Sequence, residues 1–163
     1  LVIQNEINNL HLIIEKAKAA GLIIVFNPSP YNHVIETLPM DKIDYLFINE
    51  VEGRQLSGSD NEKEIPRLIL ERYPAIKVIL TLGERGAVYA DENQYVYEPA
   101  IKTEVVDTVG AGDTFTGYFI YGIMSRKSVK ECLNMASTAS SIVIGRHGAG
   151  NSIPTLDEVE KAL

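Results

Sequence analysis

The chain has 163 residues, of which 45% are hydrophobic, and it carries 15 basic against 22 acidic side chains for a formal net charge of −7. This length can bury one sizeable core, so we expect a single α/β domain over residues 1–163. The acidic balance argues against nucleic acid or an anionic membrane as the main partner. Any anionic ligand must therefore be met by local features.

Cysteine usage predicts a reducing compartment, and the absence of long apolar runs predicts that no segment spans a membrane. The one cysteine, Cys132, cannot form an internal disulfide, and it offers no cysteine-based metal site. No basic-apolar signal segment opens the chain, and no uninterrupted apolar run reaches membrane-spanning length. We expect a cytoplasmic protein that does not bind a membrane.

Strand and helix patterns alternate through the first half of the chain. Short apolar runs predict buried strands, and apolar residues at helical spacing predict helices between them. The predicted strands cover residues 1–4, 22–26, 44–48 and 76–82, and the predicted helices cover 7–20 and 65–73, with another beginning at 49–52. This alternation is typical of a layered α/β sheet. A buried strand at the first residue needs neighbours on both sides, so we expect the chain to be part of a longer protein.

The second half begins with an expected antiparallel pair of strands at 87–90 and 95–97. A helix with a glycine-lined entrance follows, and its apolar pattern starts at Phe115. A second helix is predicted from 129 to about 144. A short one should begin after Pro154, with Thr155 and Glu158 forming a capping box.

The helix entrance at Gly110-Ala111-Gly112-Asp113 predicts an anion site. The first N–H groups of a helix have no intrahelical acceptor, and the positive end of the helix dipole lies there. A carboxylate in the same turn suits an enzyme that moves a proton as charge develops. We therefore interpret Asp113 as a base and the backbone amides of residues 110–113 as an anion hole. In the structural alternative, Asp113 only favours the positive helix end and the glycines only make a tight turn.

Two common phosphate motifs are excluded by spacing. The chain contains no Gly-x-x-x-x-Gly-Lys-Ser/Thr, and Gly110-Ala111-Gly112 lacks the continuation of a dinucleotide fingerprint. A P-loop NTPase and a nicotinamide-binding unit are both disfavoured.

The run Asp107-Thr-Val-Gly-Ala-Gly-Asp-Thr-Phe-Thr-Gly117 resembles the C-terminal signature of the ribokinase-like family of carbohydrate kinases. The resemblance extends over essentially all 163 residues. It implies an αβα sandwich with a mostly parallel central sheet and an antiparallel edge. It also implies that Asp113 takes the proton from the sugar hydroxyl, beside the anion hole of Gly110, Ala111 and Gly112.

The same resemblance implies an ATP and Mg²⁺ site. The family's Asn-x-x-Glu motif, associated with Mg²⁺ and phosphate, falls on Asn49 and Glu52, although a helix cap and capping box explain both residues on local sequence alone. Mg²⁺ commonly keeps its waters, so these residues can act through them. Thr81, Gly83 and Gly86 match the family's nucleotide-binding turn, although an ordinary turn between two strands is the alternative. Ser137 is implied near the adenine but departs from the family pattern, in which a larger polar residue is expected, so the nucleotide preference stays open.

Sugar and monovalent-cation contacts are also implied by the resemblance. Glu6, which follows the first strand, matches a sugar-contacting glutamate, and its alternative role is to start a helix favourably. A monovalent cation, K⁺, is implied at six positions, some of which contribute carbonyl groups: Asp107, Val109, Val143, Arg146, Gly148 and Ser152. Asp107 as a plain turn residue is the alternative.

The function implied is transfer of the ATP γ-phosphoryl group to a sugar hydroxyl, most similar to ribokinase. Fructokinase, nucleoside kinase and a non-catalytic nucleotide-binding or regulatory module remain alternatives. Family members are roughly twice as long, and the matching part is their C-terminal, nucleotide-binding half. We therefore expect the sugar-binding and lid half to be absent and this chain alone to be inactive, with the full-length protein compatible with a homodimer.

Overall fold

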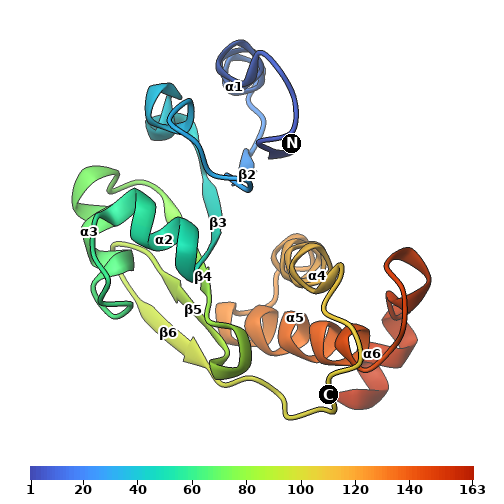
Figure 1. Ribbon diagram of the computed structural model, residues 1–163. Helices are drawn as coiled ribbons and strands as arrows, with labels where there is room; N and C mark the ends of the chain where they lie inside the picture. The colour runs from blue at the N-terminus through green and yellow to red at the C-terminus, as the bar shows by residue number, and fades with distance from the viewer. The chain divides into compact units, whose positions relative to one another are not determined.

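A computed structural model describes residues 1–163, and the chain forms two compact units (Figure 1). Unit 1 comprises Leu1–Thr81 and Tyr89–Tyr95, and unit 2 comprises Leu82–Val88 and Val96–Leu163. Six strands follow one another in one sheet in the order of the sequence: β1 (Val2–Gln4), β2 (Val25–Asn27), β3 (Tyr45–Asn49), β4 (Lys77–Thr81), β5 (Ala87–Ala90) and β6 (Tyr95–Glu98). A tight turn, in which Asp91 N–H donates to Gln94 O, joins β5 to β6.

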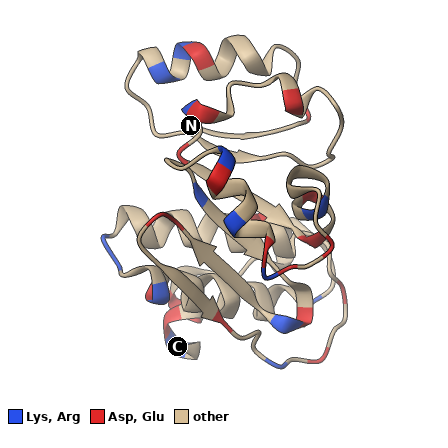
Figure 2. Ribbon diagram, turned by 90° about the vertical axis from the view of Figure 1, so that its left-hand side faces the viewer, with Lys and Arg blue, Asp and Glu red and all other residues tan.

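The first four strands, all in unit 1, are parallel neighbours. Their inward positions are apolar and fully buried, including Phe26, Leu46 and Ile79. Few charged residues lie on the strands, whereas acidic and basic residues alternate over helices and loops (Figure 2). This is the composition expected of parallel strands that are covered on both faces. It explains why short apolar runs sufficed to predict them.

Three helices of unit 1 connect these strands: α1 (Leu10–Ala19), α2 (Glu50–Ser57) and α3 (Ile65–Arg72). α2 and α3 pack closely at Gly53, where an added Cβ would lie 3.0 Å from the Ile65 side chain and 3.3 Å from that of Leu80. Four short 3₁₀ turns complete the chain: Ile35–Thr37, Met40–Lys42, Gly83–Arg85 and Gly150–Ser152.

Unit 2 contains α4 (Ala111–Met124), α5 (Val129–Ile144) and α6 (Leu156–Ala162). α4 and α5 approach closely at Gly122, where a Cβ would lie 2.7 Å from the Cys132 sulfur. Met135 and Ala139 of α5 form a buried cluster with Val159 of α6. Both predicted features of α5 and α6 are confirmed, namely the bounds of α5 and the capping box at the start of α6.

The largest departure from the predicted elements lies between α1 and β2. The strand predicted from Leu22 begins only at Val25, and Leu22 and Ile23 are exposed. Gly21, with φ of 73°, ends the helix in the left-handed conformation, and Leu22 N–H donates to Ala17 O. The backbone after the glycine is therefore used to close α1, as in a common helix C-terminal motif. α1 also begins at Leu10, three residues later than Ile7.

None of the helices combines the length and the apolarity that crossing a membrane requires.

Replacement of Gly86 should be far more damaging than replacement of Gly21. Gly86 has φ of 104°, and an added Cβ would lie 2.1 Å from Glu98 O and 2.7 Å from Ala100 N. We expect Gly86→Ala to lower the free energy of unfolding by at least about 3 kcal/mol, because strain and a backbone clash add. Gly21 also has a left-handed backbone, but an added Cβ there would have no neighbour within 4 Å. Gly21→Ala should therefore lower the free energy of unfolding by only about 1–2 kcal/mol. Urea unfolding of the two variants measures the difference, and equal losses would contradict the packing described.

Candidate functional site

Polar residues stand at the carboxyl ends of all four parallel strands in unit 1. Gln4 ends β1 beside Asn27 of β2, and Asn49 ends β3 beside Thr81 of β4. Thr81 Oγ1 also donates to Ile48 O at 3.4 Å. Open α/β sheets bind ligands at this edge. Two of the predicted nucleotide-site residues, Asn49 and Thr81, are thus direct neighbours there.

Asn49 and Glu52 form a complete capping box at the start of α2. Asn49 Oδ1 accepts from Val51 N–H at 2.9 Å and Glu52 N–H at 3.0 Å, while Glu52 Oε2 accepts from Asn49 N–H at 2.9 Å. Glu52 is only 5% exposed. The structural reading of these two residues is therefore confirmed. A carboxylate and an amide oxygen suit Mg²⁺ through its waters, and that role stays a prediction.

Glu6 lies in the turn between β1 and α1 and lines a pocket of about 350 Å³ in unit 1. Four of its eleven lining residues are asparagines, among them Asn5, Asn8 and Asn32, and four others are aliphatic. Asn5 Nδ2 donates to Pro30 O at 2.6 Å, which joins the two loops that border it. Amide groups both donate and accept hydrogen bonds, so this lining suits a hydroxylated ligand.

The predicted anion hole is the N-terminus of α4 in unit 2. Gly110 is the N-cap, with φ of 79°, and Ala111, Gly112 and Asp113 form the first turn. The Gly110 carbonyl accepts the first hydrogen bond of the helix, from Thr114 N–H at 2.9 Å, and no side chain caps this end. A Cβ added at Gly112 would meet nothing within 4 Å. Ala111 N–H already donates to Thr108 O at 3.3 Å, so the open part of this helix end is the backbone at Gly112, where helix geometry provides no intrahelical acceptor.

The loop before α4 is fastened to the end of α5. Ile144 O accepts from Val106 N–H at 2.7 Å and Asp107 N–H at 3.2 Å. The Asp107 carboxylate accepts from Val109 N–H at 3.0 Å and Gly148 N–H at 3.4 Å. These two bonds, the first most strongly, hold the pKa of the Asp107 carboxyl below its usual range. Asp107 therefore stays ionised and bridges two loops.

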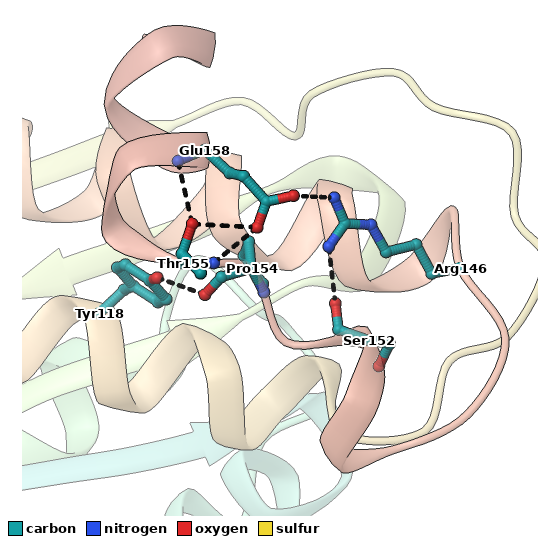
Figure 3. Close-up of polar contacts among 6 residues, drawn as sticks. All are labelled: Tyr118, Arg146, Ser152, Pro154, Thr155 and Glu158. Carbon is teal, nitrogen blue, oxygen red and sulfur yellow. Dashed lines mark hydrogen bonds and ion pairs between the residues drawn. The ribbon is translucent and has the colours of Figure 1, made fainter.

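A polar network fixes the segment after α5 (Figure 3). Arg146 donates to Ser152 O at 3.4 Å and to Glu158 Oε1 at 2.5 Å. Glu158 also accepts from Thr155 N–H at 2.7 Å, and Tyr118 of α4 donates to Pro154 O at 2.7 Å. The Arg146 guanidinium lowers the pKa of Glu158 to about 2. Tyr118 of α4 and Glu158 of α6 thus hold residues 146–155 in place.

Five of the six predicted cation positions lie on these same loops, and Val143 lies in the last turn of α5. Asp107 and Gly148 are in contact, Ser152 is buried and its Oγ donates to Ala149 O at 2.6 Å, and Val143 O accepts from Arg146 N–H at 3.0 Å. Val109 joins them through Asp107. Neutral oxygen donors with a single carboxylate fit a monovalent cation better than a divalent metal. The donor set is compatible with K⁺.

The remaining predicted positions are placed as follows. Gly83 starts a 3₁₀ turn with φ of 56° and has open space where a Cβ would be, whereas Gly86 is required by the backbone at Glu98. Ser137 is buried on α5. The close approach of the Glu98 backbone explains the glycine at position 86 without a ligand. The nucleotide contacts of Gly83, Gly86 and Ser137 stay predictions.

Two contacts of the site involve residues that the sequence reasoning did not assign to it. Ser140 Oγ on α5 donates to Ala111 O at 3.1 Å, and Glu158 pairs with Arg146. Both join residues more than ten positions apart. The polar Ser140 within the apolar pattern of α5 was the only sequence feature that pointed to the contact with Ala111. The sequence assigned Glu158 only to its capping box and gave no sign of its pairing with Arg146.

Comparison with known proteins gives one consistent result. A model of the pfkB family carbohydrate kinases matches residues 4–156. The ribokinase of Lactococcus lactis subsp. lactis (strain IL1403) is 34% identical over 165 residues, covering 100% of this chain and 53% of the relative. The chain therefore spans about half the length of the curated ribokinases it matches.

Solved structures agree. The ribokinase of Cryptococcus neoformans var. grubii serotype A in complex with ADP has a TM-score of 0.86 at 33% identity, covering 100% of this chain and 60% of that chain. The ribokinase of Arabidopsis thaliana complexed with ribose and ATP has a TM-score of 0.86 at 27% identity, covering 99% and 54%. The predicted α/β fold, mostly parallel with an antiparallel edge, is confirmed.

The Arg146–Glu158 pair should give unit 2 an acid-sensitive contribution to stability. The pKa of the Glu158 carboxyl is about 2 in the folded protein and about 4.3 in the unfolded chain. The stability that the ion pair contributes is therefore present above about pH 4.3 and is lost as the pH falls toward 2. We expect wild type to lose more stability over this window than Glu158→Gln, in which glutamine keeps the capping box. The effect should be modest because the side chains are 38% and 42% exposed.

Glu131→Gln is the matched control for that experiment. Glu131 completes the equivalent capping box with Ser128 at the start of α5, and its capping bonds are to Ser128. Its pKa is lowered chiefly by Ser128, so this variant should alter the acid sensitivity less than Glu158→Gln. Urea unfolding midpoints at about pH 5 and about pH 3 give the comparison. Identical acid losses for wild type and Glu158→Gln would show that the pair contributes nothing.

Proposed function

Because the chain belongs to the pfkB family of carbohydrate kinases, we propose that it is the C-terminal, ATP-binding and catalytic half of a ribokinase-like sugar kinase. The observation that carries this proposal is the open helix N-terminus at Gly110–Asp113, with a carboxylate in its first turn. The ribokinase relatives, two of them solved with ADP or with ribose and ATP, support ribose and ATP as the substrates.

In the proposed reaction, the carboxylate and the backbone amides of the α4 entrance have different roles. The acceptor hydroxyl oxygen forms a bond to the γ-phosphorus of ATP, the bond from that phosphorus to the bridging oxygen breaks, and ADP leaves. Asp113 accepts the proton of the hydroxyl, and the amides at Gly110–Asp113 stabilise the charge on the transferred group. Phosphoryl transfer asks for little covalent help from the protein, so positioning supplies most of the acceleration.

Nucleotide and metal contacts are proposed at the sheet edge and on the loops. Asn49 and Glu52 would hold Mg²⁺ through its waters, and the ion neutralises charge on the phosphates when bound. Thr81, Gly83 and Gly86 would contact the phosphates and ribose of ATP. Ser137 would lie near the adenine, and Glu6, which lines the pocket of unit 1 together with four asparagines, would contact the sugar.

A monovalent cation, K⁺, would be held by Asp107, Ser152 and nearby carbonyls. Its role would be to shape the backbone next to the α4 entrance, because Gly148 contacts Asp107 and Ala149 O lies 4.0 Å from the Cβ position of Gly110. The residues therefore act by holding backbone dipoles in place before the reaction begins.

The function is tested by assaying the full-length protein with ATP and Mg²⁺ against ribose, 2-deoxyribose, fructose and adenosine. We expect the highest kcat/KM with ribose. A clear preference for fructose or adenosine would reassign the substrate within the family. If ATP binds but none of these acceptors is phosphorylated, the chain belongs to a non-catalytic nucleotide-binding module. The 163-residue chain alone should show no kinase activity, since the proposal places the sugar-binding half outside it.

A further inference from the structure

Two buried hydroxyl groups in unit 2 have no hydrogen-bond partner: Thr114 Oγ1 on α4 and Thr138 Oγ1 on α5. The two residues are only 4% and 2% exposed. Burying a hydroxyl without a partner is costly, and buried polar side chains in native proteins are bonded to protein or to ordered water. Neither hydroxyl has a part in the site described above, to which Thr114 contributes only its backbone N–H.

Two contacts between α4 and α5 put the backbone positions of Thr114 and Thr138 at similar levels along the two helices. Ser140 Oγ contacts Ala111 O at 3.1 Å, and a Cβ at Gly122 would lie 3.2 Å from Cys132 Cα. The start of α4 therefore meets the end of α5, and the end of α4 meets the start of α5. Thr114 is three residues after Ala111 on α4, and Thr138 is two residues before Ser140 on α5. The corresponding steps along the axes are about 4.5 Å and 3 Å.

Helical spacing also places both residues on the faces that meet. Thr114 is four residues before Tyr118, and Thr138 is three residues after Met135. Tyr118 packs against the cluster that contains Met135, as does Ile142, four residues after Thr138. Residues three or four apart share one face of a helix. The two threonines therefore belong to the interface between α4 and α5.

We infer that a buried water molecule links Thr114 Oγ1 to Thr138 Oγ1 and so ties the first turn of α4 to α5. Buried waters typically bridge groups that otherwise lack partners. A hydroxyl both donates and accepts, so each threonine can bond the water in either direction. Thr114 directly follows Asp113, so the link makes Thr114 and Thr138 positioning residues for the anion site. That consequence rests on the proposed function, whereas the water link itself does not.

The link is tested by a double-mutant cycle of Thr114→Val and Thr138→Val in the full-length protein. Each single change leaves one hydroxyl and the water short of a partner. We expect each to raise the unfolding equilibrium constant by about fivefold to thirtyfold. The double variant removes both hydroxyls and should be less destabilised than the two single effects combined. If the hydroxyls are simply unsatisfied, each valine will instead stabilise the protein, and that result overturns the link.

Thr116→Val is the matched control. Thr116 is a buried threonine on the same helix, two residues from Thr114 and so on a different face. Its effect should add to that of Thr138→Val without coupling. Coupling as strong as that of Thr114 would contradict a specific link. A crystal structure of the full-length protein should show the water between the two hydroxyls, and a direct contact between them, or no water, overturns it.

The positioning role has its own readout. Thr138→Val should lower kcat by roughly tenfold with KM for ATP unchanged, because a displacement of about 1 Å can cost about 10²-fold and a smaller one is expected here. Thr138→Ser keeps the hydroxyl and should restore both kcat and stability. An unchanged kcat in Thr138→Val would overturn the positioning role. The stability cycle needs no activity, so failure of the proposed function and failure of the link are distinguishable.

Discussion

The left-handed backbone at Gly110 is the constraint on which the site in unit 2 depends. With φ of 79°, Gly110 turns the incoming loop so that α4 begins at the next residue. A side chain at this position would be strained, since residues other than glycine rarely adopt this conformation. The turn leaves Gly112 open to solvent and puts Asp113 in the first helical turn. The proposed anion site and the proposed base therefore come from four consecutive residues.

This entrance is held by loops that are distant in sequence. Ile144 O binds the loop that precedes it, Asp107 joins that loop to Gly148, and Arg146 fastens the next segment to Glu158. Most of these partners are backbone groups. Ordered backbone dipoles need no reorganisation when charge develops, which is what catalysis by electrostatic stabilisation requires. The cost of ordering the loops is met during folding, before any substrate binds.

Local patterns sufficed for much of this arrangement. The apolar runs found the parallel strands, and the Asn-x-x-Glu spacing found the capping box of Asn49 and Glu52, because both features arise within a few residues. The glycine entrance of α4 was visible for the same reason. The start of β2 was placed three residues early, since hydrophobicity does not reveal that Leu22 N–H is used to end α1.

Contacts between distant elements could not be predicted in this way. The bond between Asp107 and Gly148 and the pairing of Arg146 with Glu158 depend on where α5 and α6 end relative to their neighbours. The need for glycine at position 86 comes from the Glu98 backbone, twelve residues away. Likewise, the link proposed between Thr114 and Thr138 depends on the level at which α4 packs on α5, where Ser140 Oγ donates to Ala111 O.

The most direct test of the account is the catalytic rate of Asp113→Asn in the full-length protein. Asparagine keeps the size of the side chain but cannot take the proton of the acceptor hydroxyl. We expect kcat to fall by about 10²–10⁴-fold with little change in ATP affinity. The loss of charge at the helix N-terminus should cost only about 0.3–1 kcal/mol of stability. A variant that melts near the wild-type temperature and turns over at the wild-type rate would show that Asp113 is only a capping residue and would contradict the mechanism.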